Sequence, residues 1–124
     1  MTADVASYRD LKVWQRAMDL VPKLYQLAAK LPTHERFGLA GQMRRAAVSV
    51  PANIAEGHSQ RSTREFLRHL GIARASLAEL ETLLLIGQRL EYSRVEELQE
   101  LQEAITDLGM PLSGLIRRLE AKVS

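Results

Sequence analysis

Apolar side chains recur at alternating steps of three and four residues along almost the whole chain. The first run consists of Leu11, Trp14, Met18, Val21, Tyr25 and Ala28, and a second seam beside it consists of Ala17, Leu20, Leu24, Leu27 and Leu31. This spacing lines one face of an α-helix, whereas a half-buried strand would alternate residue by residue. Two adjacent seams suit a helix that touches two neighbours. The pattern therefore predicts an all-α fold.

Four helices are expected, near residues 10–31, 37–56, 62–90 and 94–121. The loops between them are short, so consecutive helices should pack antiparallel in an up-and-down four-helix bundle. A chain of 124 residues with 46% apolar and 26% charged residues has the size and composition of one globular domain. We therefore assign residues 1–124 to a single domain and expect residues 1–9 to be flexible.

Three sequence signals fix the expected helix ends. Ser62 with Glu65, and Ser93 with Glu96, have the spacing of a capping box, in which each side chain bonds an amide that the first turn leaves unpaired. Gly57 is placed to stop the second helix. These signals predict that the third and fourth helices begin at serine caps.

Proline should interrupt several of these helices, because it has no amide hydrogen and its ring clashes with the preceding turn. Pro32 ends the first helix, and Pro22 is an unfavourable residue inside it. Pro51 should kink the second helix or end it early, and Pro111 should bend the fourth.

The third helix carries more aliphatic residues than one bundle core needs. The surplus lies off its main seam, at Leu67, Ile72, Leu83, Leu85 and Ile86. Surplus apolar surface of this kind is typical of an oligomer interface. The alternative is a broad core filled by one central helix.

Charge changes sign along the chain, although the net charge is only +2 and the pI is about 9.2. Residues 33–74 hold seven Lys and Arg against three acids, and residues 79–107 hold eight acids against two arginines. This asymmetry suggests a basic face for an anionic partner, or opposite faces that pair between subunits. Solvated faces that simply differ are the third possibility.

Five arginines could form a basic strip where the second and third helices meet. They are Arg44, Arg45, Arg61, Arg64 and Arg68. Phosphate binding by such a strip gives an affinity that depends on salt and hardly on base sequence. No aromatic residue outside the core face interleaves with these arginines, so stacking of single-stranded bases is not expected.

The sequence lacks the residue patterns of common catalytic and metal sites. Without cysteine, it has no disulfide, thiolate ligand or cysteine nucleophile, which suits a reducing cytoplasm. No Glu-x-x-His pair, nucleophile elbow or phosphate-binding glycine loop occurs, so we expect no enzyme activity, no cofactor and no metal at His34, His58 or His69. No segment approaches the roughly 20 apolar residues of a membrane span. We therefore expect a cytoplasmic protein without a membrane partner.

Asn53 and Glu56 stand beside apolar core positions in residues 42–57. Burying such groups is costly unless they are hydrogen-bonded. We expect this structural polar motif to bond backbone groups freed by Pro51 or a polar partner across the bundle. The functional alternative is a polar ligand pocket in the core.

Four segments resemble a known family: residues 10–17, 35–39, 44–57 and 76–82. They are similar to bacterial four-helix-bundle proteins encoded in intervening sequences of large-subunit ribosomal RNA genes and, more distantly, to accessory variability proteins of diversity-generating retroelements. The resemblance implies a homopentamer without known catalysis that binds nucleic acid through its basic surface. Arg44 and Arg45 match the paired basic positions of the family, and its most recognisable stretch is matched by Pro51, Asn53, Glu56 and Gly57.

The leading hypothesis is a non-enzymatic, cytoplasmic homo-oligomer that binds RNA or DNA through the five arginines. The alternative is a protein-interaction or scaffold module, in which the basic second and third helices of one subunit meet the acidic fourth helix of another. A small-molecule pocket around Asn53 and Glu56 is the third hypothesis.

Overall fold

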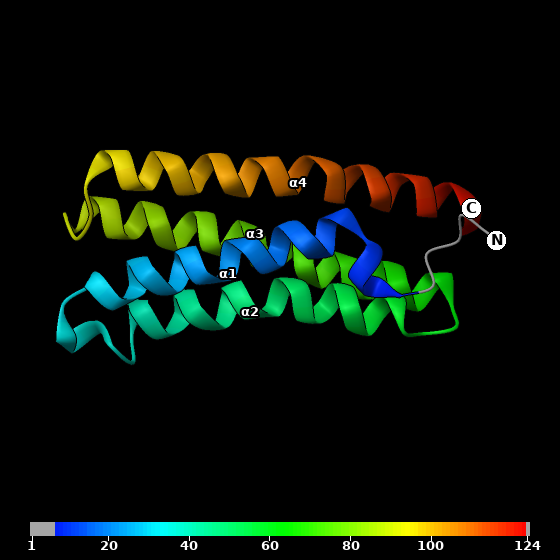
Figure 1. Cartoon of the computed structure of the whole chain (residues 1–124), viewed down its shortest axis with the longest axis horizontal. Coiled ribbons are helices and arrows are strands. Elements are labelled where there is room, and N and C mark those ends of the chain that lie inside the picture. The colour runs from blue at the N-terminus through cyan, green and yellow to red at the C-terminus, as the bar shows by residue number, and fades with distance from the viewer. Residues whose placement is uncertain (1–6, 124) are drawn as a thin grey trace.

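A computed structural model describes residues 7–123. Four long helices follow one another: α1 (Lys12–Lys30), α2 (Leu39–His58), α3 (Thr63–Arg89) and α4 (Val95–Val123). Two short 3-10 helices, η1 (Tyr8–Asp10) and η2 (Thr33–Glu35), precede α1 and α2 (Figure 1). The described residues contain no strand. The predicted all-α fold is confirmed, and each predicted helix end lies within two residues of the observed one.

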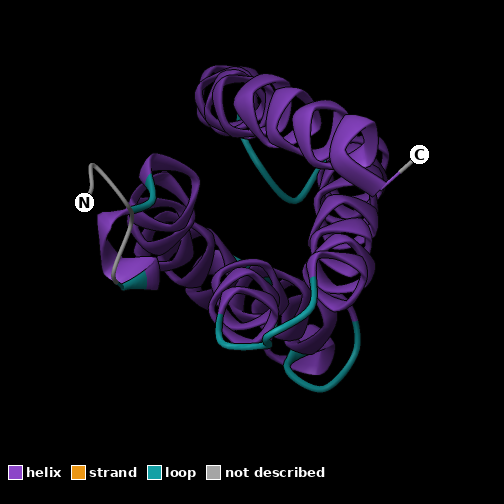
Figure 2. Cartoon of the chain, turned by 90° about the vertical axis from the view of Figure 1, so that its right-hand side faces the viewer, coloured by secondary structure: helices purple, strands orange, loops and turns teal. Residues whose placement is uncertain are grey.

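Consecutive helices run antiparallel, as the short loops predict (Figure 1). Seen from the end, the four helices surround a common centre in chain order, and α4 stands opposite α2 (Figure 2). The closest packing joins α2 to α3, and α1 meets α4 over the smallest area. Residues 1–6 of the segment expected to be flexible lie outside the described residues.

The core is aliphatic and draws on all four helices. Its largest fully buried side chains are Leu24, Met43, Ile54, Leu70, Leu80, Leu84, Leu108 and Leu112. The second seam of α1 is buried and the first only partly so: Ala28 is buried, whereas Met18 and Tyr25 are exposed. The other members of the first seam, Leu11, Trp14 and Val21, pack against the core at its margin. As the two adjacent seams predict, α1 touches two neighbouring helices, α2 and α4.

The surplus aliphatic residues of α3 are only partly used by the core. Leu83 is buried and Leu67 is half-buried, but Ile72, Leu85 and Ile86 are exposed. A broad single-chain core therefore accounts for Leu83 and leaves three large apolar side chains on the surface.

The helix ends follow the predicted signals in one case of three. The Ser62 hydroxyl accepts a hydrogen bond from the Glu65 amide at 3.3 Å and caps α3. The second predicted cap is wrong: the chain leaves α3 through Glu91, whose φ is 61°, and the Arg94 carbonyl accepts the first amide bond of α4. Gly57 is not a stop either, since α2 continues to His58 and Gly57 has no positive φ.

The helices continue through their prolines. Pro22, Pro51 and Pro111 lie inside α1, α2 and α4, so Pro51 does not end its helix early. Among the described residues, no helix combines the length and the apolar character that crossing a bilayer requires.

Candidate nucleic-acid interface

The five arginines of the predicted strip fall into two groups at different heights on the bundle. Arg44 and Arg45 lie in the N-terminal half of α2, whereas Arg61 lies in the α2–α3 connection and Arg64 and Arg68 begin α3. At 1.5 Å of rise per residue, the part of α2 beyond Arg45 separates Arg45 from Arg61 by roughly 20 Å along the bundle. Arg68 lies closer, because α3 runs back along α2 and its next residue, His69, contacts Asn53. The structure therefore replaces one continuous strip with two basic clusters.

Only one of these arginines, Arg68, has an ionic partner among the described residues. Arg68 bonds Glu65 at 3.1 Å, and the Arg44 guanidinium donates to the backbone carbonyl of Arg36 at 2.9 Å. Arg45, Arg61 and Arg64 are exposed and make no ion pair or hydrogen bond within the part of the chain that the structure describes. Their charge is free to meet an external anion.

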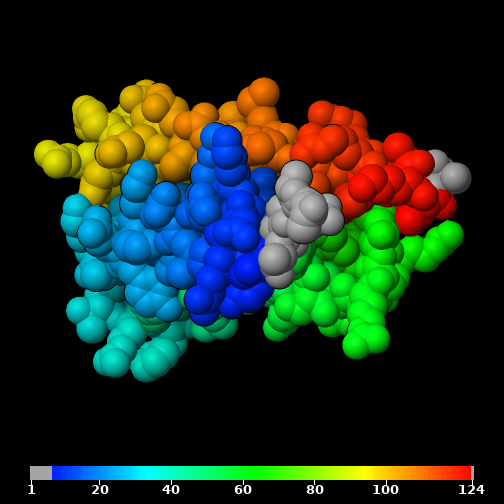
Figure 3. Space-filling view, turned by 45° about the vertical axis from the view of Figure 1, so that its right-hand side comes forward, coloured from blue at the N-terminus to red at the C-terminus, as the bar shows by residue number. Residues whose placement is uncertain are grey.

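The C-terminal end of α4 adds basic residues that sequence reasoning left out. Arg117, Arg118 and Lys122 are exposed near the end of α4, which lies at the same end of the bundle as the α2–α3 connection (Figures 1 and 3). Arg117 and Arg74 line one groove of about 460 Å³ between α4 and α3. Some 50 residues separate the two basic segments in sequence, so only the antiparallel return of α4 brings them together.

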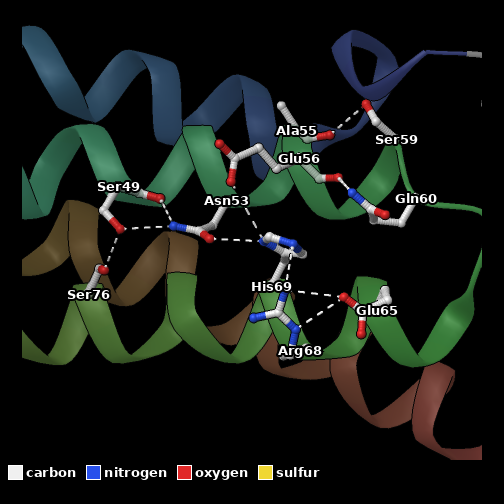
Figure 4. A network of polar contacts seen from close by, with 10 residues as sticks. All are labelled: Ser49, Asn53, Ala55, Glu56, Ser59, Gln60, Glu65, Arg68, His69 and Ser76. Atoms are coloured by element: carbon white, nitrogen blue, oxygen red, sulfur yellow. Dashed lines mark hydrogen bonds and ion pairs between the residues drawn. The ribbon is translucent and has the colours of Figure 1, made fainter.

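Asn53 bonds a partner across the bundle. Its amide donates to the carbonyl and the hydroxyl of Ser49 at 2.9 and 3.0 Å, and its oxygen lies 3.1 Å from Nδ1 of His69 on α3 (Figure 4). The Ser76 hydroxyl donates to that of Ser49 at 2.8 Å. These contacts link α2 to α3 at two points along their length.

The partners of His69 assign its tautomer. Because Asn53 presents an oxygen to Nδ1, that nitrogen carries the proton, and Nε2 is then free to accept from Arg68 at 3.3 Å. A neutral imidazole thus satisfies both contacts. Glu56 extends the network weakly, since its carboxylate is 3.8 Å from Nδ1 and its side chain is 64% exposed.

Asn53 and Glu56 both contact His69 of α3 in this fold. Proline 51 frees the carbonyl of residue 47, which neither Asn53 nor Glu56 bonds, so the prediction of a partner across the bundle is the correct one. Neither residue lines any of the five main surface grooves. No buried side-chain nitrogen or oxygen among the described residues lacks a hydrogen-bond partner.

Gly57 permits this close contact between the helices. A Cβ at this position would lie 2.6 Å from Cβ of His69 and 3.0 Å from the Phe66 ring. Glycine at position 57 therefore allows α2 to pack closely against α3. This packing is a physical reason for a glycine at the end of the 44–57 segment.

A second polar contact fastens the opposite end of the bundle. The Glu35 carboxylate accepts from the Leu39 amide at 3.0 Å and from the Tyr92 hydroxyl at 3.0 Å, which joins the α1–α2 connection to the α3–α4 loop. These two hydrogen bonds lower the pKa of Glu35, the backbone bond having the larger effect. Partial desolvation and the same carboxylate raise the pKa of Tyr92.

The histidines lie apart from one another and from clustered acids. His34 contacts Tyr92, His58 packs edge-on against Phe66, and His69 belongs to the α2–α3 network. No three His, Asp or Glu side chains of the described residues come together as a metal site would require.

Comparison with known proteins identifies a family. Residues 9–114 match the model of a family described as 23S rRNA-intervening sequence protein. A crystal structure from Bacteroides thetaiotaomicron VPI-5482, of a protein with unknown function from the S23 ribosomal protein family, superposes with a TM-score of 0.79 at 24% identity, covering 85% of this chain and 95% of that one. At that identity the likeness supports the fold alone. No curated protein is significantly similar to the chain.

Proposed function

We propose that this chain, which belongs to the 23S rRNA-intervening sequence protein family, is a non-enzymatic, cytoplasmic homo-oligomer that binds RNA or DNA through its two basic clusters. The observation that carries the proposal is the free charge of Arg45, Arg61 and Arg64, which have no anionic partner within the described chain. Exposed arginines gain little from surface ion pairs but bind phosphate through several parallel hydrogen bonds. A homopentamer is the assembly that the family resemblance implies.

A single subunit would bind nucleic acid weakly through a few phosphate contacts, and an oligomer would increase the number of these contacts. One chain presents two clusters whose far members, Arg45 and Arg61, are roughly 20 Å apart along the bundle, a span that equals about six base pairs at 3.4 Å each. An oligomer repeats both clusters around its axis, and several phosphate contacts at once give higher apparent affinity than one subunit achieves. Such binding depends on the backbone and should tolerate many sequences.

Salt titration of RNA binding tests the proposal. Fluorescence anisotropy with a labelled 20-base-pair RNA hairpin should give an affinity that falls steeply with salt, and the slope should drop by about 0.9 for each phosphate contact removed. The double variants Arg44→Gln/Arg45→Gln and Arg61→Gln/Arg64→Gln should each lower the slope. Arg89→Gln, at an exposed arginine in the acidic segment, is the matched control and should leave it unchanged.

The scaffold alternative has its own supporting observation. Ile72, Leu85 and Ile86 leave apolar surface on α3, and the exposed acids of α4 complement the basic clusters in sign. Light scattering at low and high salt, with and without the hairpin, separates the two functions. An oligomer whose mass ignores the hairpin would support the scaffold and contradict nucleic-acid binding.

A further inference from the structure

Tyr25 of α1 lies beside Arg44 and Arg45, the basic cluster in the N-terminal half of α2. With Arg44, Arg45 and Val48 it lines a surface groove of about 430 Å³ between α1 and α2. Its side chain is 44% exposed although it belongs to the apolar seam of α1. The fold thus places an exposed aromatic ring of α1 beside Arg44 and Arg45 of α2, which are distant from it in sequence.

Phe37 is a second exposed ring, next to Arg36 in the turn before α2. It is 83% exposed, the most exposed of the large apolar side chains in the described chain. The Arg36 guanidinium lies 5.2 Å from the centre of its ring and covers one side through a cation–π contact. The other side is open to solvent, and the ring has few neighbours that could bury it.

Arg44 links the groove beside Tyr25 to Arg36, the residue that precedes Phe37. It lines the groove beside Tyr25 and also a second groove of about 270 Å³, which includes Arg36. The second groove is lined by Ala28, Ala29, Leu31, Pro32, Thr33, Arg36, Ala40 and Arg44. Neither lining contains an acid, so three arginines face this surface without a compensating charge.

The acid nearest to Arg36 in sequence is Glu35, and its carboxylate is held by hydrogen bonds to other residues. Glu35 precedes Arg36, but its two carboxylate oxygens accept from the Leu39 amide and the Tyr92 hydroxyl. These bonds hold the carboxylate toward the α3–α4 loop. Glu35 forms no ion pair with these arginines, and no acid of the described chain lines either groove of the aromatic–arginine face, defined as Tyr25, Arg36, Phe37, Arg44 and Arg45.

The spacing of the face suits a short single strand. The helical part of the segment between Phe37 and the groove of Tyr25 runs from Leu39 to Arg45 and rises roughly 9 Å at 1.5 Å per residue. Three stacked nucleotides at about 3.4 Å each cover that distance. Bases of a duplex are stacked on one another and cannot reach these rings, whereas unpaired bases can.

We propose that the aromatic–arginine face binds a short unpaired stretch of RNA or single-stranded DNA, with bases stacked on Tyr25 and Phe37 and phosphates bound by Arg36, Arg44 and Arg45. The inference rests on the proposed nucleic-acid binding and narrows it to single strands at this face. Arg36 orients the Phe37 ring and leaves its outer side for a base. Arg44 retains free N–H groups besides the one that donates to the carbonyl of Arg36.

The test compares two labelled probes, a 12-nucleotide oligoadenylate and a blunt 12-base-pair RNA duplex, on the full chain by fluorescence anisotropy. Tyr25→Ala and Phe37→Ala should each weaken oligoadenylate binding at least fivefold and leave duplex binding unchanged, because each variant removes one stacking surface. Phe37→Trp should keep the affinity. Leu90→Ala is the control, since Leu90 is 50% exposed and follows the end of α3, outside the aromatic–arginine face.

Light scattering on the same samples completes the test. Unchanged oligoadenylate affinity in both alanine variants would overturn the inference, and so would a loss of affinity accompanied by a smaller particle, which would make this face a subunit interface. Binding of the duplex alone, reduced by Arg61→Gln/Arg64→Gln, would overturn the inference while the proposed function stands. Binding of neither probe by the parent protein would overturn both.

Discussion

Adding one methyl group at Gly57 should destabilise the bundle, although alanine is the better helix former. The new Cβ would lie 2.6 Å from Cβ of His69, about 1 Å closer than two carbon atoms pack. Both atoms are fixed to helical backbone, so α2 and α3 must separate. That movement also stretches the 3.1 Å contact between Asn53 and His69.

The expected magnitude follows from three contributions. Overpacking a core costs about 1–3 kcal/mol, a strained hydrogen bond about 1 kcal/mol, and replacing glycine by alanine inside a helix returns about 1 kcal/mol. Gly57→Ala should therefore lower the free energy of unfolding by about 1–3 kcal/mol. At Gly71, inside α3, an added Cβ meets nothing within 4 Å. Gly71→Ala should raise the free energy of unfolding by about 1 kcal/mol.

Urea unfolding followed by circular dichroism measures both variants. Protein concentration must be equal in all samples, because subunit association would shift the apparent stability. If Gly57→Ala were as stable as the parent or more stable, the close approach of α2 to α3 would be refuted. If Gly71→Ala were destabilised to the same extent, the loss would reflect something other than the contact with His69.

Three further outcomes are expected. Tyr92→Phe should raise the pKa of Glu35 while leaving it below its ordinary value of about 4.5, because the stronger backbone bond remains, as a carboxylate NMR titration would show. Because folding lowers the pKa of Glu35, its hydrogen bonds stabilise the fold above pH 4.5, and this stabilisation is lost as the pH falls through the folded-state pKa. In Tyr92→Phe the pKa is lowered less, so the variant should lose less stability on acidification than the parent protein does. Asn53→Ala should lower the free energy of unfolding by about 1–3 kcal/mol, because the buried ring of His69 loses its hydrogen bond to Asn53. An unchanged urea midpoint would contradict the network. Ser62→Ala should lower the free energy of unfolding by about 1 kcal/mol, because α3 loses its N-terminal cap. Urea unfolding should show this as a lower midpoint with an unchanged m-value.

Local chemistry was sufficient to predict the secondary structure. The three-four apolar spacing predicted all four helices, and the Ser62 cap was found because its bond spans only three residues. The same reasoning failed at Ser93, because the turn through Glu91 placed Arg94 at the helix start. It failed at Gly57 because a stop and a close helix contact both favour glycine.

The candidate site was less predictable than the helices. The five arginines were visible in the sequence, but their division into two clusters depends on where α2 ends and α3 returns. Arg117 and Tyr25 join these clusters from α4 and α1, which are distant in sequence. The partner of Asn53 could be foreseen only as a polar group across the bundle.

The sequence by itself determined an all-α chain with a wide apolar stripe, because helical periodicity and capping depend on neighbours within a few residues. Only the tertiary structure decided which residues of the first α1 seam are exposed, which residue bonds Asn53, and which aromatic ring stands beside Arg44 and Arg45. Those properties depend on how antiparallel helices are rotated and aligned against one another. Core packing across the whole bundle sets that alignment, and no short segment specifies it.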